Sequence, residues 1–164
     1  MKSLEGKIAV ITGGNSGIGK ATAKLFAQEG AQVIIPGRRP DVVDAAAKEI
    51  GNGAIGVCGD VAILEFHQRF AEDVNKWFGG LDIYVANAGV INLEASKNVS
   101  EAEYDNHFAV NTRGVFFGVQ AIAPLIRDGA TSLSPVHWRR PNFCRITPCM
   151  QVRRRRWPHS RGTG

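Results

Sequence analysis

The segment Thr12-Gly13-Gly14-Asn15-Ser16-Gly17-Ile18-Gly19 lies between a short β-branched run and an amphipathic pattern. The preceding residues 7–12 are typical of a buried strand, and residues 16–28 predict a helix that ends near Gly30. Glycines at such a junction permit a tight turn, a close approach of backbone to a pyrophosphate and close packing of helix on strand. The N-terminus of the helix would add free N–H groups and a positive dipole end. The segment therefore predicts a phosphate-binding turn, with an ordinary turn as the alternative.

The alternation of strand and helix continues to about residue 130. Further strands are expected at residues 32–35, 54–58 and 81–86, and further helices at 41–50, 62–78, 100–108 and 112–126. Alternating elements with short connections predict parallel βαβ units and an α/β fold, a doubly wound, Rossmann-like parallel sheet. Because no strand pattern is evident after the last helix, we expect the sheet to be truncated after about four strands.

The net charge of +5 is distributed unevenly. Residues 1–130 hold 12 basic and 15 acidic residues, a net charge of −3, whereas residues 131–164 hold eight arginines and no acidic residue. This tail includes Arg153-Arg154-Arg155-Arg156 and four of the seven prolines, which oppose helix formation. We therefore divide the chain into an incomplete dinucleotide-binding domain, residues 1–130, and a basic tail, residues 131–164, that is frameshifted or disordered.

Composition bears on the cellular compartment in which we expect the protein. Three cysteines are too few for a disulfide scaffold, and no apolar run approaches the roughly 18 residues that a membrane span needs. The N-terminus lacks a signal-peptide pattern. We expect a cytoplasmic protein without a membrane partner. Cys58 is expected to be a small core residue, and the cysteine and histidine spacings predict no metal site.

Three further motifs follow the glycine-rich turn in a fixed order. Asp60-Val61 follows the expected third strand, Asn87-Ala88-Gly89 follows the fourth, and Asn111 lies in the last helical region. With the Thr-Gly-x3-Gly-Ile-Gly pattern, these motifs resemble the short-chain dehydrogenase/reductase family over residues 4–130. The resemblance implies an NAD(P)-dependent oxidoreductase that transfers a hydride between the nicotinamide and a small-molecule carbonyl or secondary alcohol. It also implies a homo-oligomer.

The resemblance implies a role for each matched residue. Asp60 and Val61 would hold the adenine, and Asn111 would be the catalytic residue that holds a proton-relay water. Asn87, Ala88 and Gly89 would line the cofactor. The pyrophosphate would be cradled by the glycine-rich turn, namely Gly13, Asn15, Ser16, Gly17, Ile18 and Gly19. Structural alternatives remain open, because Asp60 could cap a helix, Asn87 could hold a turn and Asn111 could occupy a helix bend.

The end of the second expected strand bears on the choice of cofactor. Proteins that bind NAD often carry an acidic residue there, which hydrogen-bonds the ribose hydroxyl. This chain has Gly37 followed by Arg38 and Arg39, and guanidinium groups can bind a 2′-phosphate in a forked geometry. The sequence thus favours NADP(H) as the cofactor, with NAD(H) as the alternative. For the two arginines themselves, the alternative is that both are solvated surface charges without a ligand.

The resemblance also implies a fifth strand soon after Arg127-Asp128-Gly129-Ala130 that ends in a catalytic serine, followed about a dozen residues later by a Tyr-x-x-x-Lys motif. Residues 131–164 contain neither tyrosine nor lysine. Because a missing general acid or base lowers rates by about 10²–10⁴, we expect turnover to be impaired. The alternative is a non-catalytic nucleotide-binding fragment. A nucleic-acid-binding role of the arginine tail is less favoured, since the tail lacks interleaved aromatic or helical organisation.

The genetic code suggests why the motif is missing. Read one base out of register, Cys149–Met150 must encode Tyr or His and Met150–Gln151 must encode Ala, while Arg153–Arg154 permits Lys. We therefore hypothesise a frameshift near Ala130. Sequencing the coding DNA tests this: codons 149–154 should spell Tyr-x-x-x-Lys out of frame, and the hypothesis fails if they cannot.

Overall fold

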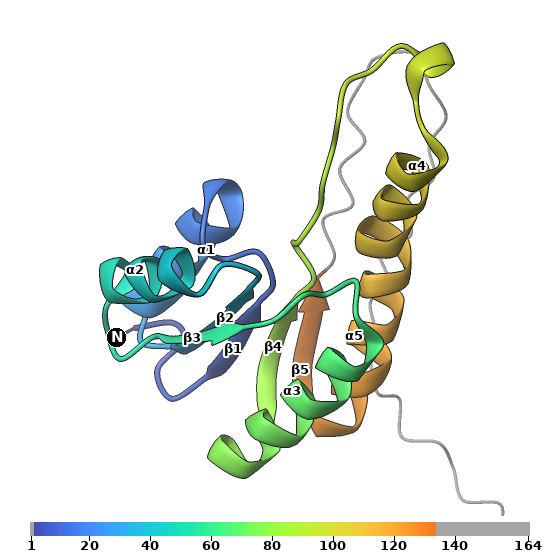
Figure 1. The fold of residues 1–164 in the computed structure, drawn as a ribbon. Coiled ribbons are helices and arrows are strands. Elements are labelled where there is room, and N and C mark those ends of the chain that lie inside the picture. The colour runs from blue at the N-terminus through green and yellow to red at the C-terminus, as the bar shows by residue number, and fades with distance from the viewer. Residues whose placement is uncertain (1, 134–164) are drawn as a thin grey trace, which may run out of the picture.

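β-Branched and small apolar residues form the centre of a parallel sheet in the computed structural model, which describes residues 2–133 (Figure 1). The strands are β1 (Ile8–Ile11), β2 (Gln32–Gly37), β3 (Ile55–Cys58), β4 (Leu81–Val85) and β5 (Ile126–Leu133). All five are parallel, in the order β3-β2-β1-β4-β5. This confirms the expected doubly wound α/β fold.

Alternate residues of β1 face two hydrophobic clusters on opposite sides of the sheet. Ala9 and Ile11 pack with residues of α1 (Gly17–Gln28) and α2 (Pro40–Ile50). Ile8 and Val10 pack instead with residues of α3 (Leu64–Phe78) and α5 (Val115–Ile122). Because both faces are covered, the central strands are apolar throughout, as parallel sheets require.

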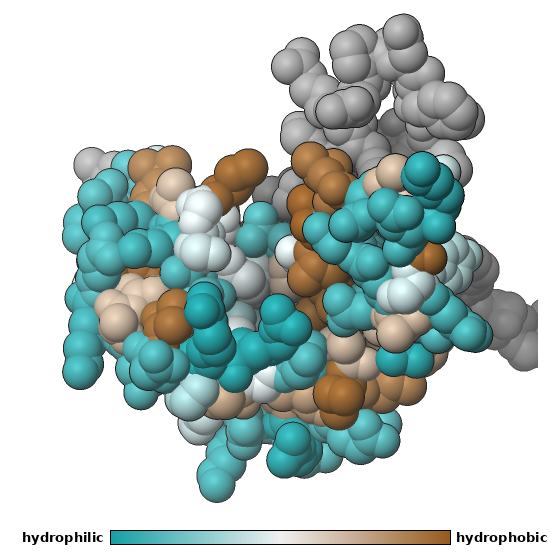
Figure 2. Space-filling model, turned by 45° about the horizontal axis from the view of Figure 1, so that its top comes forward, coloured by the Kyte–Doolittle hydropathy of each residue, from teal (hydrophilic) through white to brown (hydrophobic). Residues whose placement is uncertain are grey.

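The strand order reverses at β1, whose neighbours are β2 on one side and β4 on the other. In open α/β sheets, the crevice beyond the carboxyl ends of the strands at such a reversal is the usual ligand site. The molecular surface is hollowed between the side formed by α1 and α2 and the side formed by α4 (Glu101–Phe108), and hydrophobic groups flank the hollow (Figure 2).

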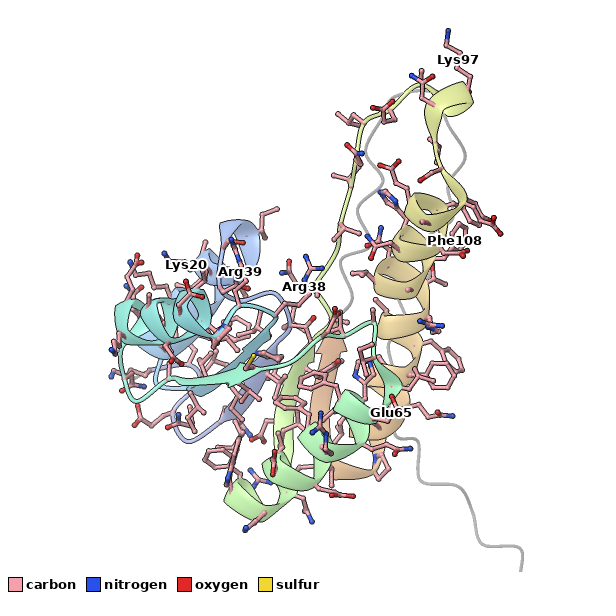
Figure 3. The ribbon with its side chains drawn as sticks, in the orientation of Figure 1. Lys20, Arg38, Arg39, Glu65, Lys97 and Phe108 are labelled. Atoms are coloured by element: carbon pink, nitrogen blue, oxygen red, sulfur yellow. The ribbon has the colours of Figure 1, made fainter. Side chains whose placement is uncertain are left out.

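The segment between β4 and α4 extends away from the sheet, with Lys97 at its far end (Figure 3). It contains the short 3₁₀ helix η1 (Ser96–Asn98). His107 on α4 accepts a hydrogen bond from the Asn92 N–H at Nε2 (3.0 Å), and the Asn92 amide group donates to the Glu103 carboxylate. These contacts tie the part of the segment that leads away from the sheet to α4.

The last helical region differs from the two separate helices expected. α4 continues into the π-helical segment η2 (Ala109–Gly114) and then into α5, so the axis is unbroken. The regular helix ends at Ile122 rather than near residue 126, because the 3₁₀ turn η3 (Ala123–Leu125) contains Pro124. None of the helices within residues 2–133 combines the length and hydropathy needed to cross a membrane.

The expectation of about four strands is wrong by one strand. β5 begins at Ile126, which is buried, and pairs with β4 from Leu81 onward. This strand passes through residue 130, and the division of the chain near that residue stays a prediction. Most of the basic tail, residues 134–164, lies outside the described residues, and so do the frameshift hypothesis and the proposed nucleic-acid contact.

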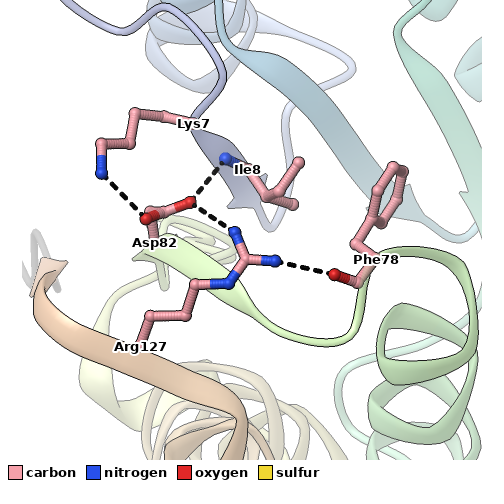
Figure 4. Close-up of polar contacts among 5 residues, drawn as sticks. All are labelled: Lys7, Ile8, Phe78, Asp82 and Arg127. Carbon is pink, nitrogen blue, oxygen red and sulfur yellow. Dashed lines mark hydrogen bonds and ion pairs between the residues drawn. The ribbon is translucent and has the colours of Figure 1, made fainter.

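Asp82 fixes the first residues of β5 to the amino-terminal edge of the sheet (Figure 4). Its carboxylate accepts hydrogen bonds from the Ile8 N–H (2.9 Å), from Lys7 Nζ (3.0 Å) and from Arg127 Nη1 (3.1 Å). Arg127 also donates to the Phe78 carbonyl oxygen at 2.7 Å. Burial opposes ionisation of Asp82, but the hydrogen bonds and nearby positive charges hold its pKa below the ordinary 3.8. One carboxylate therefore joins β1, β4 and β5.

We expect Asp82→Asn to lower the free energy of unfolding by about 1.5–3 kcal/mol at pH 7, because three donors lose a charged acceptor. The difference from wild type should shrink as the pH falls through the lowered pKa of Asp82, since the carboxylate then gains its proton in both states. Urea unfolding at several pH values measures this. Glu49→Gln, which removes an exposed partner of Lys20 and Lys24, is the control and should change little.

Candidate nucleotide-binding site

The glycine-rich turn runs from the end of β1 into the first turn of α1. Gly13 and Gly17 have φ values of +66° and +52°, which glycine adopts without strain. Ser16 precedes the helix in an extended conformation and its hydroxyl does not cap the helix. The first turn of α1 contains no acidic residue, and its N–H groups have no carbonyl partner within the helix. This geometry fits a bound phosphate.

Two other glycines in the turn allow close packing. A Cβ atom on Gly14 would lie 2.4 Å from Ile35 Cγ2, and one on Gly19 would lie 2.5 Å from the Gly13 carbonyl oxygen. The Cβ atom on Gly19 would also lie 2.4 Å from Asn87 Nδ2. Any side chain at either position would push the turn away from the sheet.

Asn87 and Ala88 hold the turn against the end of β4. Asn87 Nδ2 donates to the carbonyl oxygens of Thr12 (3.0 Å) and Gly13 (3.5 Å). The Ala88 N–H donates to Thr12 Oγ1 at 2.9 Å, and the Thr12 hydroxyl donates to the Val85 carbonyl oxygen at 3.4 Å. Thr12 was not singled out from the sequence, although its place between the strand and the first glycine was visible.

The end of β2 packs closely against side chains of α2 and of the glycine-rich turn. A Cβ atom on Gly37 would lie 2.8 Å from Val43 Cγ2 and 2.9 Å from Asn15 Oδ1. The next residues, Arg38 and Arg39, are exposed, and neither side chain pairs with a described residue. Figure 3 shows both at the edge toward which β4 and β5 point in Figure 1. Two free cations therefore lie beside the crevice.

Asp60 and Val61 form the turn between β3 and α3. Asp60 Oδ1 accepts a hydrogen bond from the Ala62 N–H (2.9 Å), and the Asp60 carbonyl accepts one from Ile63 (3.0 Å). Asp60 thus shapes the turn before α3, but it does not cap that helix as the alternative proposed, because the N-cap residue of α3 is Ile63 and has no side-chain cap. Its second carboxylate oxygen has no hydrogen-bond partner among residues 2–133, so it is available to a ligand.

Asn111 makes a paired contact with the segment after β4. Asn111 Oδ1 accepts from the Val90 N–H and Asn111 Nδ2 donates to the Val90 carbonyl, both at 2.8 Å. The residue lies in η2, and π-helical segments of this kind are frequent at functional sites. Its side chain therefore fixes the segment beside Gly89, and its role in holding a proton-relay water stays a prediction.

The structure thus brings most of the expected residues to one edge of the sheet. The glycine-rich turn follows β1, Arg38 follows β2, Asp60-Val61 follows β3 and Asn87-Ala88-Gly89 follows β4. Cys58 is exposed rather than buried, because β3 is the edge strand of the sheet. No group of three histidine, cysteine, aspartate or glutamate residues that could hold a metal ion occurs within residues 2–133.

The sequence of residues 7–132 matches the short chain dehydrogenase family. The chain is similar to elsinochrome reductase 1 of Elsinoe fawcettii, 40% identical over 119 residues that cover 70% of this chain and 44% of the reductase. It is 39% identical to tetrahydroxynaphthalene reductase of Pyricularia oryzae, over 70% of this chain and 42% of that protein. The chain spans about half the length of the curated relatives that it matches.

Solved structures are similar over the described fold. A short chain dehydrogenase from Burkholderia cenocepacia in complex with NADP superimposes with a TM-score of 0.75 and 34% identity, covering 80% of this chain and 55% of that chain. The 3-ketoacyl-(acyl-carrier-protein) reductase of Brucella melitensis, complexed with NADH, gives the same TM-score and identity and covers 80% and 57%.

We expect Asn111→Ala to speed hydrogen exchange at the Val90 amide by at least about tenfold, because the Val90 N–H loses its acceptor. Hydrogen–deuterium exchange with peptide or residue resolution measures this. Thr112→Ala is the matched control, since Thr112 is exposed on the same helical segment. An unchanged exchange rate in Asn111→Ala would contradict the positioning role.

Proposed function

The chain belongs to the short-chain dehydrogenase family, and from this premise we propose that residues 2–133 bind NADP(H) for hydride transfer between its nicotinamide and a carbonyl or secondary alcohol. The single observation that supports NADP(H) most directly is the end of β2. Gly37 is closely packed against Val43 and Asn15, so an acidic side chain cannot be placed there without displacing them. Arg38 and Arg39 follow it as unpaired cations.

Each part of the crevice suits a different part of the dinucleotide. The acid-free first turn of α1 would hold the pyrophosphate, with the N–H groups near Gly17 and Gly19 as donors. Arg38 would bind the 2′-phosphate, with Arg39 beside it. The free oxygen of Asp60 would accept from the adenine amino group, and Val61 would donate to the base. Asn87, Ala88 and Gly89 would line the ribose and nicotinamide side.

When bound, the nicotinamide accepts or supplies the hydride. The residues of this chain orient it and restrict its surroundings: Asn111 holds Val90, and through it the segment that carries Gly89, at the edge of β4. Reduction of a carbonyl is the direction that we favour. This follows the names of two similar proteins, elsinochrome reductase 1 and tetrahydroxynaphthalene reductase.

Cofactor binding without turnover is the second candidate. The 164 residues contain no tyrosine after Tyr104 and no lysine after Lys97, so Tyr-x-x-x-Lys is absent from this sequence. A tuned tyrosine would otherwise exchange the proton at the substrate oxygen. A chain that binds NADP(H) but reduces no carbonyl substrate would support this candidate.

We expect the double variant Arg38→Ser/Arg39→Ser to weaken NADPH binding by at least about tenfold, and NADH binding by less than about threefold, because only NADPH carries the 2′-phosphate. Isothermal titration calorimetry at fixed salt gives both dissociation constants. Arg69→Ser, which removes an exposed arginine from α3, should change neither. Equal losses for the two cofactors would contradict the proposed role of the arginines.

A further inference from the structure

The carbonyl group of Val61 lies against two helical elements. His67 Nε2, on α3, is 2.8 Å from the Val61 carbonyl oxygen. A carbonyl only accepts hydrogen bonds, so Nε2 carries the proton and donates. His67 is only 4% exposed, and its ring lies beside that of Phe66 on its own helix and close to Gly118 of α5. A buried histidine therefore holds the inner side of the loop between β3 and α3.

The second element is η2. A Cβ atom on Gly114 would lie 2.6 Å from the Val61 carbonyl oxygen and 3.2 Å from its carbon, so the Val61 carbonyl fits closely against Gly114. Arg113 Nη2 donates to the Ala62 carbonyl oxygen at 3.2 Å. The loop is thus held from α3 and from η2 through its carbonyl oxygens.

The polar groups on the rest of this loop are left for a ligand. The Val61 N–H donates to no carbonyl or side chain of residues 2–133, and the same holds for the second carboxylate oxygen of Asp60 as an acceptor. One donor next to one acceptor matches the edge of adenine that carries N1 and the 6-amino group. Rotation of the peptide that follows Val61 would disturb this pairing.

We propose that His67 is the positioning residue of the adenine-binding loop: its hydrogen bond to the Val61 carbonyl keeps the Val61 N–H and the free Asp60 oxygen in register with the base. The inference rests on the proposed NADP(H) binding. It adds a residue from the hydrophobic core, which does not touch the cofactor, to the set that determines recognition of the base.

The environment of His67 keeps its hydrogen-bonding pattern fixed. Burial lowers the pKa of His67 below its ordinary 6.5, while the bond to Val61 and the nearby Asp60 carboxylate act in the opposite direction. The ring is therefore neutral at pH 7, with its one proton on Nε2. On its other side the ring lies against α5: a Cβ atom on Gly118 would lie 3.2 Å from His67 Cε1 and 3.3 Å from His67 Nδ1.

Base discrimination tests the proposal. The 164-residue chain is titrated with NADP and with its hypoxanthine analogue, in which a carbonyl replaces the 6-amino group and N1 carries a proton. Wild type should prefer NADP by at least about tenfold, because the analogue reverses donor and acceptor at both contacts. His67→Leu should reduce this preference to less than about threefold, whereas His67→Gln, which can still donate to Val61, should keep most of it. His107→Leu is the matched control and should keep it entirely.

The outcomes separate the two proposals. If wild type binds neither nucleotide, the proposed function fails and this inference with it. If wild type prefers NADP and His67→Leu keeps the same preference, only the positioning role is overturned. If His67→Leu does not fold, ¹⁵N spectra of histidine-labelled wild type decide: NADP should shift the ring nitrogens of His67 and not those of His107, and an unmoved His67 signal would overturn the role.

Discussion

The hydroxyl of Thr12 joins the carboxyl ends of β1 and β4, and the candidate site depends on this junction. Thr12 Oγ1 accepts from the Ala88 N–H while its own proton is directed to the Val85 carbonyl, and the Thr12 N–H donates to that carbonyl at 2.9 Å. The glycine-rich turn and the segment after β4 are therefore fixed against each other before any ligand binds. A cradle built in this way loses little entropy when it receives a phosphate.

η2 performs the corresponding task for the loops that follow β3 and β4. Asn111 binds both backbone groups of Val90, and Gly114 fits against the carbonyl of Val61. Those two loops follow strands that are separated in the sheet by β2 and β1. One irregular helical segment thus sets the spacing between the expected adenine loop and the expected nicotinamide side. Both contacts come from the π-helical segment, a geometry that is frequent at functional sites.

Local pattern was sufficient to predict the first four strands, most helices and the edge where the site lies, because glycines, alternation and apolar runs act over a few residues. Local pattern was insufficient wherever a contact with a residue far away in the sequence determines the structure. The pattern predicted no strand after the last helix, yet β5 begins at Ile126, and Asp82, 45 residues away, binds Arg127 at its start. The exposure of Cys58 depends on β3 lying at the sheet edge. The partners of Asn111 and His67 are likewise set by tertiary packing, so their roles in positioning loops were not visible.

Charge at the site is arranged locally, and the net charge of the chain does not describe it. The crevice has no acid in the first turn of α1, none at position 37, and two unpaired arginines directly after it. The second carboxylate oxygen of Asp60 has no partner among residues 2–133 and is free for the proposed contact with the base. The proposed preference for a 2′-phosphate would then rest on the absence of acidic side chains as much as on attraction to the two arginines. Removing Arg38 and Arg39 would abolish the attraction, but a carboxylate at position 37 would still have to displace Val43 and Asn15. Reversal of the proposed cofactor preference would therefore need a shift of the Val43 and Asn15 side chains in addition to a change of charge.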